Sequence, residues 1–198
     1  WKKYVEATGE LSRLCYREEI EAAMRTKDLS GISLLGLQDF PGQGTALVGM
    51  LDSHLEPKPF DFAKPEKFRA FFKEQLVLVG LEKYTYEEGE TLCADVQIAN
   101  YGKTDCAGDL EWTLWAYMPD EGLDSVRKVA VKSGHMSAVS CPKGTLSKAG
   151  TLKIELNHRI TAPVRCDLTV KIADAVNSYP IWIYKSELPK CPESVYET

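Results

Sequence analysis

The sequence lacks several features that would place it in common functional classes. No apolar run approaches the roughly 20 residues of a membrane span. Lys and Arg do not cluster in a chain of net charge -5. Neither a membrane nor a nucleic-acid partner is therefore expected. The histidines, His54, His135 and His158, stand far apart, so no metal site is predicted. The glycines of the Gly42-Gln43-Gly44 stretch are too few for a phosphate loop, and no cofactor is predicted.

Close cysteine pairs are also missing. The six cysteines have neither the spacing of a zinc ribbon nor that of a redox motif. Cys93 and Cys166 lie within apolar, strand-like runs, where a free thiol behaves as a small hydrophobic group. We interpret the cysteines as structural thiols, which favours a reducing, cytoplasmic compartment; a disulfide framework is the alternative.

What the sequence contains is a globular composition with a change of pattern near residue 75. Hydrophobic residues make up 44% and charged residues 27% of the 198 residues, which argues against wholesale disorder. The first residues, WKKYVEATGE, have no signal-peptide core and read as the interior of a longer chain. We therefore expect a fragment with two parts, residues 1–74 and residues 75–198.

The first part follows a helix–strand–helix pattern. Residues 3–25 predict a helix with an apolar stripe at Leu11, Leu14, Cys15 and Ala22. Its charged pairs, Arg13–Arg17 and Glu18–Glu21, are expected on a solvated face. Residues 32–37 predict a buried strand, and residues 45–55 a short helix. A Pro-containing linker held by Phe60 and Phe62 follows, and a helix should begin at Pro65 and end near Glu74.

The second part alternates apolar and polar residues with a period of two. Strands are predicted at 76–81, 92–98, 110–118, 126–131, 150–156, 166–173 and 179–184, separated by turn residues. About seven short strands and no helix indicate an immunoglobulin-like antiparallel β-sandwich. The fold class is therefore mainly β. Two strands carry aromatic residues on both faces, which predicts that part of the outer face packs against a neighbouring domain or stacks on sugar; these aromatics are Trp112, Trp115, Tyr117, Trp182 and Tyr184.

The order of these segments resembles a known enzyme family. A helix containing LCYREEIEAAMRT, the stretch LQDFPGQGTALVG, a PKP linker and a sandwich ending in IWIY together resemble the C-terminal part of family 2-type glycoside hydrolases. The resemblance covers essentially the whole chain, and LQDFPGQGTALVG is its specific part. It is strongest to a bacterial subgroup in which an immunoglobulin-like domain follows a (β/α)8 catalytic barrel. It implies that residues 32–37 are the eighth barrel strand. Gln38, Asp39 and Phe40 would then be substrate-binding residues at its C-terminal end.

The resemblance also implies where catalysis occurs. A retaining glycosidase needs two carboxylates about 5 to 5.5 Å apart. In the resembling barrels these come from the fourth and seventh strands, upstream of Trp1. No catalytic residue is therefore expected here, and the fragment alone should be inactive. For Asp39 two interpretations stay open: a contact to a sugar hydroxyl, or a loop or helix cap that accepts amide hydrogens near Gly42 and Gly44.

Three functional hypotheses follow. The first is the C-terminal fragment of a glycoside hydrolase, whose partners are the rest of the parent chain and a carbohydrate substrate. The second is an independent carbohydrate-binding module that uses the outer aromatics, and the third is a structural interaction domain. An orphan strand exposes unpaired backbone groups on both edges, so self-association through residues 1–60 is also predicted.

Overall fold

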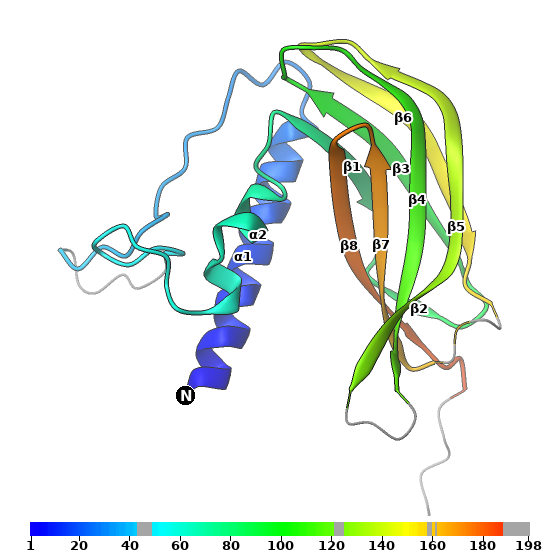
Figure 1. The fold of residues 1–198 in the computed structure, drawn as a ribbon, viewed down its shortest axis with the longest axis horizontal. Coiled ribbons are helices and arrows are strands. Elements are labelled where there is room, and N and C mark those ends of the chain that lie inside the picture. Colours follow the sequence, from blue (N-terminus) through cyan, green and yellow to red (C-terminus); the bar gives the residue numbers. More distant parts are fainter. Residues whose placement is uncertain (43–48, 121–124, 158–159, 161, 188–198) are drawn as a thin grey trace, which may run out of the picture.

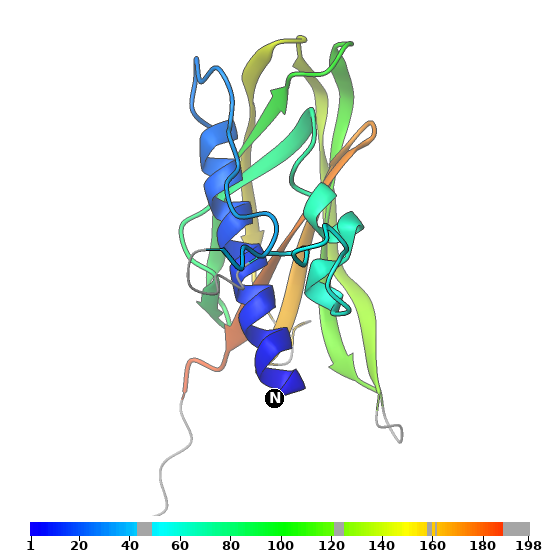
Figure 2. The ribbon, with the colours of Figure 1, turned by 90° about the vertical axis from the view of Figure 1, so that its left-hand side faces the viewer.

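The computed structural model describes residues 1–42, 49–120, 125–157, 160 and 162–187. These residues form a mainly β protein in which a long helix, α1 (Lys2–Met24), lies beside two β-sheets (Figure 1). A 3-10 turn, η1 (Asp61–Ala63), and a short helix, α2 (Pro65–Arg69), precede the first strand. Seen from the side of α1, the helix runs roughly along the strand direction (Figure 2).

The strands form two sheets. One sheet has the order β1-β3-β6 and the other the order β2-β8-β7-β4-β5. Neighbouring strands are antiparallel except for β2, which pairs with β8 in parallel. Sequence alternation therefore predicted the sheet-forming region and most of its strands. The strands are β1 (Gln75–Leu81), β2 (Thr85–Glu87), β3 (Thr91–Asn100), β4 (Cys106–Pro119), β5 (Val126–Cys141), β6 (Thr145–Glu155), β7 (Val164–Ile172) and β8 (Ala175–Tyr184).

The main core lies between the sheets and follows the period-two pattern. In β3 the side chains of Leu92, Ala94, Val96 and Ile98 are buried, while Thr91, Cys93 and Asp95 between them are exposed. Burying one large apolar side chain stabilises a fold by about 1.5 to 3 kcal/mol, so these inward rows hold the two sheets together. Cys93 is thus a surface thiol, contrary to its expected place in the interior.

One strand is much longer than predicted. β5 continues past residue 131 to Cys141 because residues 132–141 pair with residues 106–114 of β4. Gly134 makes this pairing compatible with the large ring opposite: a Cβ on Gly134 would lie 2.7 Å from Cζ2 of Trp112. The Trp112 ring packs over this glycine.

The predicted strand at residues 32–37 does not form. Residues 30–36 are irregular, and Gly36 has a positive φ of 84°. Isolated bridges occur nearby between described residues, Gln38 with Leu51 in parallel and Leu51 with Pro57 antiparallel. A buried parallel strand needs a neighbour on each edge, and among the described residues the backbone of this stretch meets Leu51 at its C-terminal end, where the Leu37 carbonyl accepts the Leu51 N–H at 3.0 Å. The predicted helix at 45–55 is likewise absent from residues 49–55, while residues 45–48 lie outside the described ranges.

The orientation of α1 also differs from the prediction. Its buried residues are Arg17, Ile20 and Glu21, whereas Leu11 is 61% exposed and Cys15 is exposed. The helix is therefore rotated so that two charged residues face the sandwich and much of the apolar stripe faces solvent. The periodicity of the sequence could not reveal this, because Arg17 and Glu21 are four residues apart whether they face solvent or a buried polar partner.

A small second core joins the linker to α1. Phe62 lies over Gly9, where a Cβ would come within 2.2 Å of the ring, so Gly9 allows close packing without interrupting the helix. Phe60 and Phe62 stack at 5.6 Å, as their role in the linker suggested. The Glu6 carboxylate accepts backbone N–H bonds from Asp61 and Phe62 at 3.3 and 3.1 Å. α2 begins at Pro65 as predicted but ends at Arg69, before Glu74.

Candidate functional site

The first candidate is the loop that contains Gln38, Asp39 and Phe40. Asp39 is 7% exposed, and its Oδ1 accepts an N–H bond of 2.9 Å from Gly49. The same oxygen forms a 2.9 Å ion pair with Lys58 Nζ. The backbone N–H of Asp39 donates to the Leu51 carbonyl at 2.9 Å. The carboxylate therefore joins three stretches of chain. Among the described residues its amide donor is Gly49, whereas the sequence pointed to amides near Gly42 and Gly44, and Gly44 lies outside the described ranges.

Gly49 is required at this point by close packing. A Cβ there would lie 2.4 Å from the Gln38 carbonyl carbon, a contact that real side chains do not make. Gln38 acts through its backbone, which bridges to Leu51. Phe40 is 53% exposed, and its ring lies over Gly42. The three predicted residues are thus adjacent on one loop. Asp39 is buried, whereas the side chains of Gln38 and Phe40 are both exposed and free to meet a ligand.

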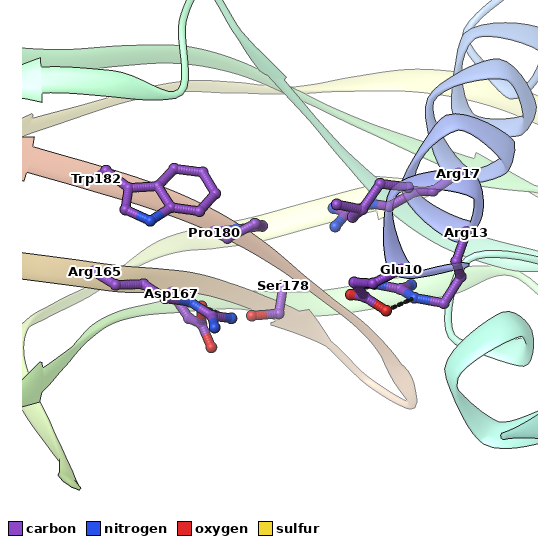
Figure 3. Close-up of a pocket in the computed structure, with 9 residues that line it drawn as sticks. Glu10, Arg13, Arg17, Arg165, Asp167, Ser178, Pro180 and Trp182 are labelled. Carbon is purple, nitrogen blue, oxygen red and sulfur yellow. Dashed lines mark hydrogen bonds and ion pairs between the residues drawn. The ribbon is translucent and has the colours of Figure 1, made fainter. Parts of the chain in front are cut away.

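The second candidate is a pocket between α1 and the outer face of the five-stranded sheet, here called the helix–sheet pocket. Its volume is about 230 Å³. Figure 3 shows side chains of α1 on one side and of β7 and β8 on the other. It is lined by Glu10, Arg13, Leu14, Arg17, Arg165, Asp167, Ser178, Pro180 and Trp182.

The charged side chains of the helix–sheet pocket are arranged as pairs. On α1, Arg13 donates from Nε and Nη2 to the two Glu10 oxygens at 2.9 and 2.6 Å, and this hydrogen bonding lowers the pKa of Glu10. On β7, Arg165 Nη2 lies 3.4 Å from Asp167 Oδ1. The pocket therefore offers guanidinium donors and carboxylate acceptors side by side, next to the indole of Trp182.

Aromatic and cationic side chains alternate across the sheet beside this pocket. Trp182 in β8 stands opposite Arg165 in β7, and Tyr117 in β4 stands opposite Lys128 in β5. The Arg165 guanidinium lies 5.0 Å from the Tyr117 ring centre, and Lys128 Nζ lies 5.4 Å from the same ring and 5.5 Å from that of Trp115. Cations thus cover the outward rings of Trp115 and Tyr117, which explains how aromatics occur on both faces of β4.

Asp167 anchors this row. Its Oδ2 accepts the Tyr117 hydroxyl at 2.5 Å and lies 3.5 Å from Lys128 Nζ. Burial and the bond to Asp167 raise the pKa of Tyr117. A carboxylate with so many partners holds the outer face in one arrangement, so the surface beside the pocket is preorganised.

Behind the pocket, a buried polar network joins α1 to the sandwich. Glu21 is fully buried; it receives Arg17 Nε at 2.9 Å, Asn177 Nδ2 at 2.9 Å and the Tyr179 hydroxyl at 2.8 Å. The Tyr179 oxygen also accepts the Val79 N–H at 3.0 Å. Burial, followed by the charge of Glu21, raises the pKa of Tyr179. Burial by itself would lower the pKa of Arg17. The charge and hydrogen bonds of Glu21 and Tyr179 have the larger effect, so the Arg17 pKa is raised.

Sequence reasoning missed both the pocket and the network, although one signal was present. Asn177 and Tyr179 occupy the same face of β8 as Ile181 and Ile183, so two polar groups point into the core. Buried polar groups need partners, and their presence indicates that a further polar element enters the sandwich edge. That element is the helix α1, which contributes the Glu21 carboxylate.

Other site types are not represented in the described part of the chain. No group of three or more His, Cys, Asp or Glu side chains is placed there to bind a metal ion, and His158 lies outside the described ranges. No described helix is long and apolar enough to cross a membrane.

Comparison with known proteins gives one family match, which covers less than half of the chain. A family profile described as a domain of unknown function (DUF8488) matches residues 90–185, the region from β3 to β8. No curated protein matches the sequence.

Solved structures share only a distant likeness with the chain. Sporulation control protein Spo0M from Bacillus subtilis is 16% identical with a TM-score of 0.43, over 57% of this chain and 50% of that protein. A β-glucosidase from Listeria innocua in complex with gluconolactone is 15% identical with a TM-score of 0.41, over 58% of this chain and 16% of the enzyme. A cycloisomaltooligosaccharide glucanotransferase from Paenibacillus sp. is 14% identical with a TM-score of 0.41, over 55% and 14%. The match spans half or less of each protein, and at these scores it assigns no activity.

Proposed function

We propose that this chain is the C-terminal part of a glycoside hydrolase acting on O-glycosidic bonds in carbohydrate metabolism. Residues 1–74 would be the end of a catalytic (β/α)8 barrel of the family 2 type with a linker, and residues 75–198 an immunoglobulin-like sandwich behind it. The strand order, with β1 and β2 divided between the two sheets, agrees with that type of sandwich.

The observation that supports this proposal most is the exposed apolar surface of the first 60 residues. Leu35 is 95% exposed, Tyr4 78%, Leu55 62%, Leu11 61% and Phe40 53%. Such a concentration is unusual on a free-standing protein and marks a surface that another structure covers. A barrel would cover it and would give residues 32–37 the neighbouring strands that they lack.

In this proposal the chain supports catalysis but does not perform it. Asp39 is held by Gly49 and Lys58, and a retaining reaction needs two carboxylates about 5 to 5.5 Å apart. Both would come from barrel strands contributed by the rest of the parent chain. The side chain of Phe40 would lie at the mouth of the barrel, where it could contact the sugar.

The decisive experiment uses the coding sequence upstream of Trp1. The longer protein should hydrolyse aryl glycosides, while the 198-residue chain should show no turnover above a buffer blank. Leu35→Lys in the longer protein should reduce activity, because a charge would enter the barrel packing. Upstream sequence without a barrel pattern, or turnover by the short chain that Asp39→Asn abolishes, would contradict the proposal.

Carbohydrate binding by the chain itself is a second candidate, favoured by the helix–sheet pocket. An aromatic ring beside paired guanidinium and carboxylate groups can stack on a sugar ring and bond to its hydroxyls. Trp182→Ala should then abolish retention in affinity electrophoresis on polysaccharide gels. The control is Trp1→Ala, which removes a 76% exposed indole from the chain terminus. Equal retention of both variants and the unaltered chain would show that the helix–sheet pocket is not the carbohydrate-binding site.

A further inference from the structure

Two cysteines that are far apart in the sequence face each other in the five-stranded sheet. Cys106 at the start of β4 and Cys141 at the end of β5 are directly paired residues of the antiparallel ladder. Opposite residues of such a pair have Cα atoms about 4.5 to 5.5 Å apart, with side chains on the same face. A disulfide bond spans Cα separations of about 4.4 to 6.8 Å. The backbone therefore already has the spacing that a cross-strand disulfide needs.

Both side chains point into the core. Cys106 is 2% exposed and Cys141 is fully buried, and each is a free thiol in the structure. Burial, followed by the charge of the neighbouring Cys141, raises the pKa of Cys106. Cys141 Sγ lies 3.3 Å from the Ile98 carbonyl oxygen, a weak bond that a disulfide would replace with a covalent one.

The surrounding loops hold this pair together. Asn100, which is fully buried, donates from Nδ2 to the Thr104 carbonyl at 3.0 Å and to the Cys141 carbonyl at 2.9 Å. Asp105 Oδ1 accepts the Lys143 N–H at 2.9 Å. These bonds tie the two chain segments together at the points where the chain passes between sheets. The cysteines are thus kept adjacent by side chains other than their own.

We propose that Cys106 and Cys141 form an intramolecular disulfide bond when the chain folds in the presence of a disulfide oxidant such as oxidised glutathione. The thiolate of one cysteine attacks a glutathione sulfur and releases one glutathione thiolate. The second cysteine thiolate then attacks the protein sulfur of the mixed disulfide and releases the other. Two protein thiols and one glutathione disulfide become one protein disulfide and two glutathione thiols.

The timing of this step follows from burial. In the folded chain neither sulfur is open to glutathione, so the bond forms before the sandwich closes and afterwards resists reduction. Its effect is to fasten β5, an edge strand of its sheet, to β4. The other described cysteines have no such partner: Cys15 and Cys93 are on the surface, and Cys166 pairs with Ala116 and Ile181.

The test is refolding of the full chain from denaturant in a glutathione redox buffer and, in parallel, with excess reductant. Material with native circular dichroism is then denatured, alkylated and mapped by mass spectrometry. We expect a mass lower by two hydrogen atoms and a peptide that links Cys106 to Cys141. We also expect the thermal midpoint to be about 10 °C higher than that of the reduced chain.

Variants distinguish this pair from other thiols. Cys106→Ala should abolish the linked peptide and the shift in midpoint, whereas Cys93→Ala should preserve both. Complete alkylation of Cys106 and Cys141 after oxidative refolding, or linkage of either one to a different cysteine, would overturn the proposal. Mapping the chain after expression in an oxidising compartment gives a second measurement that does not depend on refolding, with the same two outcomes.

Discussion

The hydroxyl of Tyr179 in β8 donates a 2.8 Å hydrogen bond to Glu21 in α1, a residue 158 positions earlier in the chain. Arg17 and Asn177 bind the other Glu21 oxygen, so a fully buried carboxylate has its charge and its hydrogen bonds satisfied. This contact fixes the helix against the open edge between β1 and β8. It also makes the first part of the chain a structural partner of the sandwich.

Removing the Glu21 carboxylate should destabilise the protein strongly. In Glu21→Ala the Arg17 guanidinium stays buried without its partner, which costs about 3 to 5 kcal/mol. Urea unfolding followed by circular dichroism measures the loss. Glu19→Ala, on the exposed side of the same helix, is the matched control and should change stability by less than about 0.5 kcal/mol. A similar small effect for both variants would show that the network is not stabilising.

The coupling between Glu21 and Tyr179 can be measured separately. Tyr179→Phe removes the hydroxyl that connects Glu21 to the Val79 N–H and should cost about 1 to 3 kcal/mol. In a double-mutant cycle with Glu21→Ala, the two losses should be non-additive by about 0.5 to 3 kcal/mol. Strict additivity would mean that the two groups act independently.

The sandwich should fold without the first 74 residues, because its core lies between its own two sheets. A chain of residues 75–198 should unfold cooperatively, but at a lower urea concentration than the full chain. Truncation removes the Glu21 partner of Asn177 and Tyr179, and it uncovers Leu76 and Leu78, against which Met24 packs. Failure to unfold cooperatively would contradict the boundary at residue 75.

Within this domain, Leu114 is fully buried, so Leu114→Ala should lower the free energy of unfolding by about 2 to 5 kcal/mol.

The exposed apolar residues of the first segment should cause self-association when the chain is isolated. Size-exclusion chromatography with light scattering should show species larger than a monomer, and Leu35→Lys should shift the population toward monomer. Val126→Lys is the control, since it changes a 64% exposed apolar residue outside residues 1–60. A strictly monomeric chain that Leu35→Lys leaves unchanged would contradict the prediction.

Stability should fall at high pH through Tyr84. Burial, followed by the hydrogen bond to Glu18, raises the Tyr84 pKa from 10.0 to about 12. The folded chain therefore keeps this proton while the unfolded chain releases it. The contribution is fully present below pH 10 and is lost as the pH rises toward 12. Urea unfolding between these values should show a shallower decline for Tyr84→Phe than for the control Tyr184→Phe, at the exposed end of β8. Equal slopes would contradict the assignment.

Local pattern alone predicted the sheet-forming region and most of its strands, but neither β2 nor residues 132–141 of β5. The alternation of Leu92, Ala94, Val96 and Ile98 with polar residues predicts which face of β3 is buried, because successive side chains of a strand point to opposite faces. Pro65 marked the start of α2 in the same local way. The candidate site was less accessible to this reasoning. Asp39 was predicted either to contact a sugar hydroxyl or to cap a loop or helix. Its actual partners, Gly49 and Lys58, lie in segments that only the fold brings together.

The sequence by itself determined that strands follow residue 75 and which of their side chains are buried, because a period of two is a property of neighbouring residues. Only the tertiary structure decided which face of α1 is buried and whether residues 32–37 become a strand. Arg17 and Glu21 are spaced like any solvated pair, and Asn177 and Tyr179, more than 150 positions away, make their burial favourable. Residues 32–37 have the composition of a buried strand, but a strand also requires partners for its backbone amides and carbonyls, and its own sequence cannot provide them.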